Sequence, residues 1–468
     1  MRWDIGMDLG TDFVRTADFK QGAALEAAAR LAFRGDRETP LCCGDVAARI
    51  AGRCCAGVEV VAPMKNGALE NNFYADRLFR WIYRQTEGLA RGKRFGAMIA
   101  CAPFARPVQQ EALLTAAMDA GASEAALVRA DAAAALGAGL DLNGPEAKLV
   151  VDVGAGKVTA TLFTMGRVAA FGHLPYGLGR IDERVQRIVR VEGGYRIGLN
   201  SAREIKHTLG TALPESAPQD VVMHMTGFSM ERRLPEAFDV ETRPVLHACE
   251  EVVSEIAGLC AGVVAEIPEE LSADLNDAGA TLVGGGAELA GLDKRIGDTL
   301  GIPCRIADAP GKCAVRGLAE IMRAPEKYGA AVLDVYKRQA LIREGRRFAE
   351  AHPESALFRA VGGELSQIEA RTVIDLAKAG DPDCEKLFDD YVYHLTVGLV
   401  NLINLYDPEI IALGGGVSRA GAFLLDKVNA LLPEMIFFKT MPHAKIELAR
   451  LGNDAGIIGA AMLGRQEA

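Results

Sequence analysis

Two stretches of this chain share one pattern of apolar and polar positions. In 4–11 and again in 149–157, an apolar run includes an Asp, Asp8 or Asp152, and then reaches a glycine-containing turn. Each turn leads into a second apolar run, which covers 158–163 in the second case. Short apolar runs bounded by glycine are typical of buried strands. The pattern therefore predicts two strand–turn–strand units.

The chemistry of the two turns suits a phosphate ligand. They read Gly10-Thr11-Asp12-Phe13 and Gly154-Ala155-Gly156-Lys157. Glycine lets a turn approach a phosphate closely, and consecutive amides form an anion-binding concavity. Asp8 and Asp152 are candidates to hold Mg²⁺ through water. One such turn alone predicts only a tight hairpin. Two of them predict a duplicated α/β fold that clamps a triphosphate between its halves.

Two further segments suit the nucleoside end of such a ligand. The run 280–289 predicts a buried strand, the glycines Gly284-Gly285-Gly286, and then an amphipathic helix from Ala287, so that a helix N-terminus faces a ligand. A second helix is predicted to begin at a Ser201 cap. Its charged residues either edge a nucleoside pocket or form a solvated face, and they are Arg203, Glu204 and Lys206.

These four segments, in this order, resemble the actin-like ATPase superfamily and within it the MreB family, over residues 3–330. The motifs at 120–122, 136–140, 193–198 and 301–303 add to the resemblance. It implies an α/β, actin-like (ribonuclease H-like, duplicated) fold that binds ATP and Mg²⁺. It also implies self-association into filaments, contact with the inner membrane surface and the cell-wall elongation machinery, and a role in cell shape.

The chain departs from the MreB pattern at the position of the catalytic carboxylate. The family's Glu-Glu-Pro turn reads Arg129-Ala130-Asp131 here, so Ala130 takes the place of the Glu that orients water. Asp131, one residue away and shorter, is a weak substitute. Because phosphoryl transfer depends on positioning and electrostatics, we expect at most a weak ATPase.

Other departures lie beside the expected ligand. Lys157 stands where the family has Thr, and an extra lysine binds phosphate as a point charge. Asp12 would repel a γ-phosphate if it pointed inward. Arg203 replaces the Glu of a Glu-x-x-Lys pair, with Glu204 displaced by one position. The N-terminus is too short for an amphipathic membrane helix, which leaves Phe95 as a candidate membrane contact.

Composition and charge narrow the range of partners, the location of the protein and the role of its cysteines. The 468 residues carry a net charge of −10, which argues against nucleic acid as a partner. No apolar run reaches membrane-spanning length, so we expect a cytoplasmic protein that is membrane-associated through its filaments. The adjacent cysteine pairs 42–43 and 54–55 favour reduced thiols, with a zinc site as the alternative.

The sequence changes character in its last part. A strand–glycine–helix pattern recurs at 408–418, and 451–461 closes with Asn-Asp-Ala-Gly. Residues 340–466 resemble the C-terminal part of ROK-family sugar kinases and repressors, without the family's phosphate hairpin, catalytic Asp or zinc motif. We expect no sugar kinase activity, although a ROK-family (glucokinase-like) kinase or repressor is the alternative identity. The expected domains are 1–330, a junction at 331–345, and 346–468.

The junction holds the hexapeptide Asp334-Val335-Tyr336-Lys337-Arg338-Gln339. The codons GAT GTG TAT AAG AGA CAG encode it, and they close the mosaic-end adapter of transposon-based sequencing libraries. We therefore expect a chimera of two genes, with a natural fusion as the alternative. A plain helix turn, with residues 333, 336, 340 and 341 on one face, is the structural alternative. An incomplete ROK fragment is expected to expose the apolar side chains of Val397, Leu399, Val400, Leu402 and Ile403.

Overall fold

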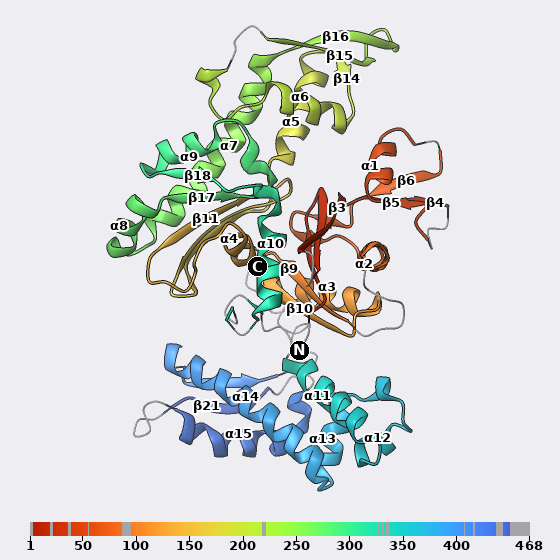
Figure 1. Cartoon of the computed structure of the whole chain (residues 1–468), viewed down its shortest axis with the longest axis vertical. Coiled ribbons are helices and arrows are strands. Elements are labelled where there is room, and N and C mark those ends of the chain that lie inside the picture. The colour runs from red at the N-terminus through yellow and green to blue at the C-terminus, as the bar shows by residue number, and fades with distance from the viewer. Residues whose placement is uncertain are drawn as a thin grey trace, which may run out of the picture. The chain divides into compact units, whose positions relative to one another are not determined.

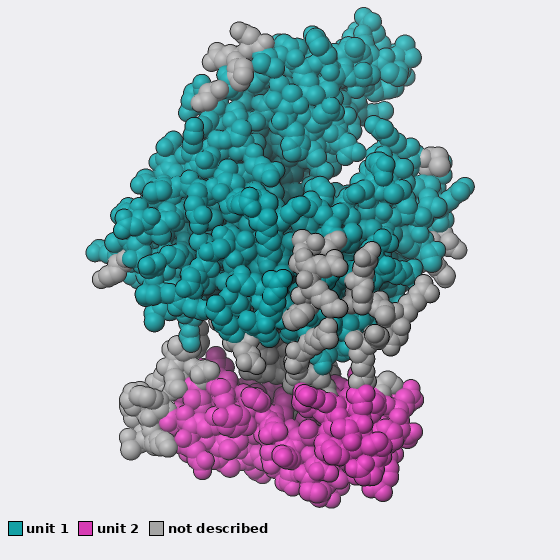
Figure 2. Space-filling view, viewed as in Figure 1, with its two compact units in different colours: residues 1–335 teal, residues 336–468 magenta. Residues whose placement is uncertain are grey.

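The computed structural model describes residues 3–18, 22–35, 39–54, 56–86, 95–217, 221–325, 327–328, 332–333, 337–406, 408–414, 417–436 and 443–449. The chain divides into two compact units, Met1–Val335 and Tyr336–Ala468, coloured teal and magenta in Figure 2. Within the described ranges, no helix combines the length and the apolar character needed to cross a membrane.

Two sheets form the frame of the first unit (Figure 1). One contains β1 (Ile5–Leu9), β2 (Phe13–Asp18), β3 (Gly22–Ala28), β9 (Gly96–Cys101), β10 (Glu124–Arg129) and β19 (Val332–Leu333). The other contains β11 (Lys148–Val153), β12 (Val158–Thr164), β13 (Arg167–Leu174), β17 (Ala280–Val283) and β18 (Cys304–Ile306). Their orders are β19-β10-β9-β1-β2-β3 and β13-β12-β11-β17-β18. In both, three antiparallel strands are followed by two parallel ones, which confirms the predicted duplication.

Two helices meet in the middle of the first unit, where Figure 1 shows α4 (Ala130–Gly137) beside α10 (Cys313–Arg323). Their backbones touch at two glycines. A Cβ on Gly137 would lie 1.8 Å from the Cys313 carbonyl oxygen, and a Cβ on Gly317 would lie 1.8 Å from that of Ala133. Only glycine at both positions allows the helices to pack this closely.

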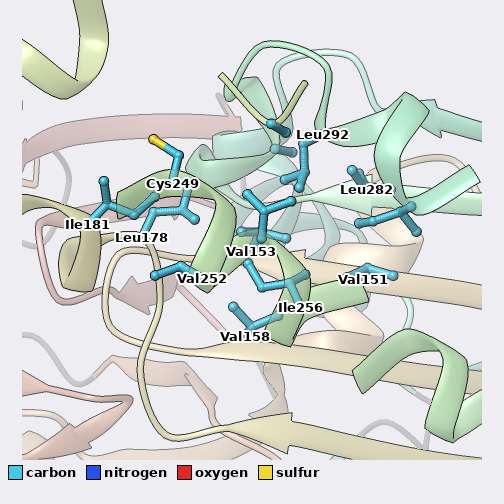
Figure 3. Packing of buried hydrophobic residues seen from close by; sticks show 14 of the residues in the cluster. Val151, Val153, Val158, Leu178, Ile181, Cys249, Val252, Ile256, Leu282 and Leu292 are labelled. Carbon is cyan, nitrogen blue, oxygen red and sulfur yellow. The ribbon is translucent and has the colours of Figure 1, made fainter. Parts of the chain in front are cut away.

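The largest core lies on the second sheet. Side chains from α5 (Gly179–Val191), α6 (Leu199–Leu209), α7 (Thr242–Ala265) and α9 (Leu292–Leu300) contribute to it. Figure 3 shows Val252 and Ile256 of α7 beside Val151, Val153 and Val158 of the sheet. All five side chains are buried, and burying each one stabilises the fold by about 1.5–3 kcal/mol. This core fixes the strand that carries Asp152.

Smaller elements complete the first unit. A three-stranded sheet of β4 (Leu31–Arg34), β5 (Cys42–Cys43) and β6 (Val58–Val61) accompanies α1 (Asp45–Ile50). The hairpin β7 (Met64–Lys65) and β8 (Ala68–Leu69) precedes α2 (Asn72–Gln85), and α3 (Pro107–Asp119) follows β9. A further sheet of β14 (Tyr195–Arg196), β15 (Val222–Ser229) and β16 (Pro235–Glu241) precedes α7, and α8 (Glu269–Ala278) follows it.

Two predicted helix starts were wrong. The helix predicted from Ser201 is α6, which begins at Leu199 after an extended Gly198, so Ser201 lies inside it. The run after β17 forms a short 3₁₀ helix, η2 (Gly285–Glu288), and α9 begins only at Leu292. The reason is Gly291, whose left-handed backbone (φ 77°) separates the two helices.

The second unit has its own core. It contains α11 (Lys337–Ala351), α12 (Ala356–Ala360), α13 (Ala370–Lys378), α14 (Pro382–Tyr406), β20 (Ile410–Leu413), α15 (Ala422–Met435) and β21 (Lys445–Leu448). The prediction of an exposed stripe was wrong for Leu399, Val400 and Ile403, which are buried because α13 and α15 pack on α14. Val397 is half-buried and Leu402 is 44% exposed.

The junction is only partly described. Val332 and Leu333 pair with Val128 and Leu127 of β10 and so belong to the first sheet. Because Leu333 lies in a strand, the alternative of one helical face from 333 to 341 was wrong. Residues 334–336, the glycines 415–416 and the segment 451–461 lie outside the described residues.

Candidate functional site

The two predicted turns are matched hairpins that lie against each other. The Gly10 amide donates to the Phe13 carbonyl, and the Gly154 amide donates to that of Lys157, both at 2.9 Å. A Cβ on Gly156 would lie 2.1 Å from Thr11 Oγ1, so the second turn packs directly on the first. The structure thus brings together the two turns that the sequence placed more than a hundred residues apart.

Asp152 and Lys157 form the centre of this contact. The Lys157 ammonium donates to Asp152 Oδ2, and both side chains are mostly buried. Burial alone would lower the pKa of this ammonium, but the carboxylates of Asp152, Asp8 and Asp131 raise it above its ordinary value. The lysine is therefore a fixed positive charge between the turns.

Asp8 lies across from this pair at the end of β1. Burial raises the pKa of its carboxyl to about 6. Arg15 and Lys157 oppose that rise, and Asp152 adds to it. Asp8 and Asp152 are therefore close enough to influence each other, as expected for two residues sharing one cation.

The glycine segment, residues 284–287, packs on Asp152 and the neighbouring Val153. A Cβ on Gly284 would lie 2.4 Å from Asp152 Oδ1, and the φ of this glycine is 81°, so no other residue fits there. Gly286 packs on Val153, and Ala287 is buried. Gly285 differs, because a Cβ there would meet nothing within 4 Å. Its exposed backbone is the part of the segment that is open to a ligand.

A chain of alternating charges connects α6 to the first turn. Lys206 contacts Asp182 at 2.7 Å, and Arg203 contacts Asp182 at 3.3 Å. Arg203 also contacts Asp12 Oδ2 at 2.9 Å, and Arg30 contacts Asp12 Oδ1 at 2.9 Å. The sequence interpretation missed Asp182 and Arg30. A carboxylate among the apolar positions of an amphipathic helix was the available signal for Asp182, because a buried charge needs a partner.

This chain of charges includes Asp12 and excludes Glu204, two residues that the sequence predicts at the site. Both carboxylate oxygens of Asp12 are bound by arginines, which offsets the repulsion that we expected towards a phosphate. Glu204 lies outside the chain, with an exposed side chain on α6. Arg203 and Lys206 therefore point towards Asp182, and Glu204 belongs to the solvated face.

Ala130 and Asp131 begin α4 beside the second sheet. Ala130 is buried, and its methyl group offers no hydrogen-bonding atom to water. The Arg129 guanidinium donates to both oxygens of Asp131, at 3.1 and 2.6 Å. The Thr161 hydroxyl and the Ala132 amide also donate to it, at 2.8 and 2.9 Å. These bonds hold the Asp131 carboxylate within the protein.

The remaining candidates have structural contacts. Phe13 is 43% exposed, with the Arg15 guanidinium 5.2 Å from its ring centroid. Phe95 packs edge-on against Tyr83, at 4.8 Å between centroids. The Cys54 thiol donates to the Ile50 carbonyl at 3.0 Å, and Cys55 lies outside the described residues. In the described part of the chain, no group of three or more His, Cys, Asp or Glu side chains is arranged to hold a metal.

The site carboxylates therefore do not fit Mg²⁺ as the resemblance implied. Mg²⁺ needs oxygen ligands in near-octahedral geometry and is repelled by an adjacent ammonium. Here the Lys157 ammonium already binds Asp152, and Asp8 stands opposite this pair.

Comparison with known proteins agrees with this geometry. The family described as MreB/Mbl protein matches residues 2–329, and the ROK family matches residues 350–467. The cell shape-determining protein MreB of Escherichia coli K12 is 28% identical over 331 residues, which cover 70% of this chain and 95% of that protein. Mbl of Bacillus subtilis 168 is 27% identical, covering 69% of this chain and 97% of Mbl.

Solved structures show the same fold. MreB5 of Spiroplasma citri bound to AMPPNP superposes with a TM-score of 0.65 at 23% identity, over 70% of this chain and 98% of MreB5. A MamK double helical filament gives a TM-score of 0.58 at 18% identity, over 68% of this chain and 98% of MamK. With a family match that spans most of its length and an actin-like fold, this chain belongs to the MreB/Mbl family.

Proposed function

We propose that the first unit is a cell-shape cytoskeletal protein that binds ATP where its two hairpin turns meet and that assembles into filaments. The observation that carries this proposal is the packing of the turns on each other around Asp8, Asp152 and Lys157. Its relatives are cell shape-determining proteins, MreB5 was solved with AMPPNP, and MamK was solved as a filament.

The described residues suggest how the nucleotide is held. The amides inside the turns, at 11–12 and 155–156, bind the phosphates, since turn amides form anion sites and the Gly10 and Gly154 amides close the hairpins. We assign the exposed backbone at Gly285 to the nucleoside end, together with Arg203 and Lys206, which pair with Asp12 and Asp182. Gly285 is the most useful position to test, because a side chain added there enters open space without displacing protein atoms.

Hydrolysis is slow in this proposal. Ala130 cannot orient water, and Asp131 is bound by Arg129, Ala132 and Thr161. Without a positioned water, phosphoryl transfer loses a major part of its acceleration. In this proposal the protein therefore responds mainly to the binding of the nucleotide and much less to its hydrolysis.

The setting of the filament follows from the family. We propose that the protein works in the cytoplasm against the inner membrane, together with the cell-wall elongation machinery. The ROK-like second unit adds no sugar kinase activity in this proposal, and a coupled hexokinase-type assay on the whole chain is expected to give no signal.

Sedimentation tests the main proposal. The full chain is pelleted with ATP, with ADP and without nucleotide, and equilibrium binding of a fluorescent ATP analogue is measured in parallel. We expect ATP binding and more protein in the pellet with ATP. Gly285→Leu should lose binding while keeping its melting temperature. Gly262→Leu on α7, where a side chain also enters open space, should behave as wild type. Equal pelleting in all three conditions, with no ATP binding, would refute the proposal.

A further inference from the structure

The position of Lys157 raises the question of what neutralises the phosphates. The lysine lies in the turn between β11 and β12, and its ammonium is bound to Asp152. Asp8 and Asp131 are its other carboxylate neighbours. A positive charge that belongs to the protein thus already occupies the place between the carboxylates at which a metal ion was expected.

Packing on the first half of the unit holds the stem of this lysine. A Cβ on Gly67, in the β7–β8 turn, would lie 3.0 Å from Lys157 Cδ and 3.3 Å from Phe104 Cζ. The side chain therefore passes from the second sheet's hairpin along the β7–β8 turn and the residues after β9. It is only 18% exposed. This packing fixes the ammonium in place and limits its freedom to move away for a metal ion.

We propose that Lys157 is a tethered counter-cation that replaces the divalent metal, so that the cleft binds a nucleoside triphosphate without Mg²⁺. This inference rests on the proposed nucleotide binding. A lysine ammonium binds phosphate as a point charge with three donors. Mg²⁺ gives up its water reluctantly, and here it would also have to displace the ammonium from Asp152.

Neighbouring charges favour the same arrangement. Burial would lower the pKa of the Lys157 ammonium, but the carboxylates of Asp152, Asp8 and Asp131 raise it above its ordinary value, so the ammonium stays charged at neutral pH. Asp131 is bound by the Arg129 guanidinium, which leaves Asp8 and Asp152 to share Lys157. An ammonium has three donors, so the oxygens of an entering triphosphate can take the donors that do not bind Asp152 while the ammonium stays in place.

Binding titrations with and without divalent metal test this inference. The affinity of the full chain for ATP is measured by calorimetry, once with excess Mg²⁺ and once with EDTA. We expect the two dissociation constants to agree within about threefold, a difference below 1 kcal/mol. Lys157→Thr, which supplies a hydroxyl in place of the ammonium, should bind ATP at least about tenfold more weakly in EDTA than in Mg²⁺.

Two further variants control the comparison. Lys148→Thr removes a lysine at the other end of β11, where it pairs with Glu146, and should behave as wild type. Lys157→Arg keeps the charge and should keep binding in EDTA. If Lys157→Thr fails to fold, the wild-type and Lys157→Arg titrations still decide.

The outcomes separate this inference from the proposed function. ATP binding that requires Mg²⁺ in the wild type overturns the inference and leaves nucleotide binding intact. Metal-independent binding that Lys157→Thr does not change overturns it too. No ATP binding in either condition refutes both proposals.

Discussion

Residues that depart from the MreB pattern contact one another or residues of the site. Asp12 and Arg203 both differ from the residues expected there, and they form an ion pair with each other at 2.9 Å. Lys157 differs as well, and it binds Asp152. Opposite charges introduced at both ends of one contact compensate each other electrostatically. The charges that these departures introduce are therefore paired within the site.

A double-mutant cycle on Asp12 and Arg203 tests this pairing. Asp12→Asn, Arg203→Gln and the double variant are compared by thermal unfolding. We expect a coupling free energy of about 1 kcal/mol, since both side chains are mostly buried. The more exposed pair Arg232 and Glu236 is the matched control, and we expect about 0.5 kcal/mol or less there. Equal coupling in both pairs would show that the contact has no special role in the cleft.

A second prediction concerns Ala130, which takes the place of the expected catalytic carboxylate. Ala130→Glu places a carboxylate at the start of α4, where the family has one, and should increase phosphate release from ATP by about tenfold or more. Ala130→Met adds comparable bulk without an oxygen and should give no increase. Phosphate release is measured on the full chain, with melting temperatures to confirm that both variants are folded. No gain with a folded Ala130→Glu would mean that another group limits hydrolysis.

At the scale of elements, the crossing of α4 and α10 depends on two glycines. Gly317→Ala would bring a methyl group to 1.8 Å from the Ala133 carbonyl oxygen, which forces the helices apart. We expect a loss of about 1–3 kcal/mol in stability, as for other overpacked sites. It is measured as a lower melting temperature of the full chain.

Gly258 of α7 provides the matched control. It is also a helical glycine, but a Cβ there meets nothing within 4 Å. Gly258→Ala should therefore leave stability unchanged or raise it by up to about 1 kcal/mol, because alanine favours the helix. If both variants melt alike, the close approach of α4 and α10 does not limit stability.

Local patterns and tertiary contacts explain which elements the sequence could predict. The hairpins at Asp8 and Asp152 were predictable, because a strand followed by a glycine turn is encoded within a dozen residues. The start of α9 was not, since it depends on the left-handed backbone of Gly291. The contact between Asp12 and Arg203 was not predictable either, because it joins residues far apart in the sequence whose approach only the fold determines.

At the scale of the whole molecule, the two units match different protein families. The first unit contains both hairpins with glycine turns and the glycine segment at 284–287. The second unit matches the ROK family over 350–467 and repeats a strand and glycine pattern at β20. It nevertheless buries Leu399, Val400 and Ile403 in a core of its own. The described residues of the second unit therefore form a hydrophobic core among themselves.

The junction between the units supplies the last prediction. Residues 334–339 have the sequence that the adapter codons would encode, whereas Leu333 still pairs with β10 and Leu341 is already buried in the second unit's core. The two compact units thus divide inside the hexapeptide, between the MreB/Mbl match that ends at residue 329 and the ROK match that begins at residue 350. We expect that amplification of the source genomic DNA across codons 334–339 gives no product, while primers within codons 1–330 and within codons 346–468 each give one. A joined gene would encode a linker with no reason to match an adapter. A spanning product that contains these six codons would establish a natural fusion, and the second unit would then need a function of its own.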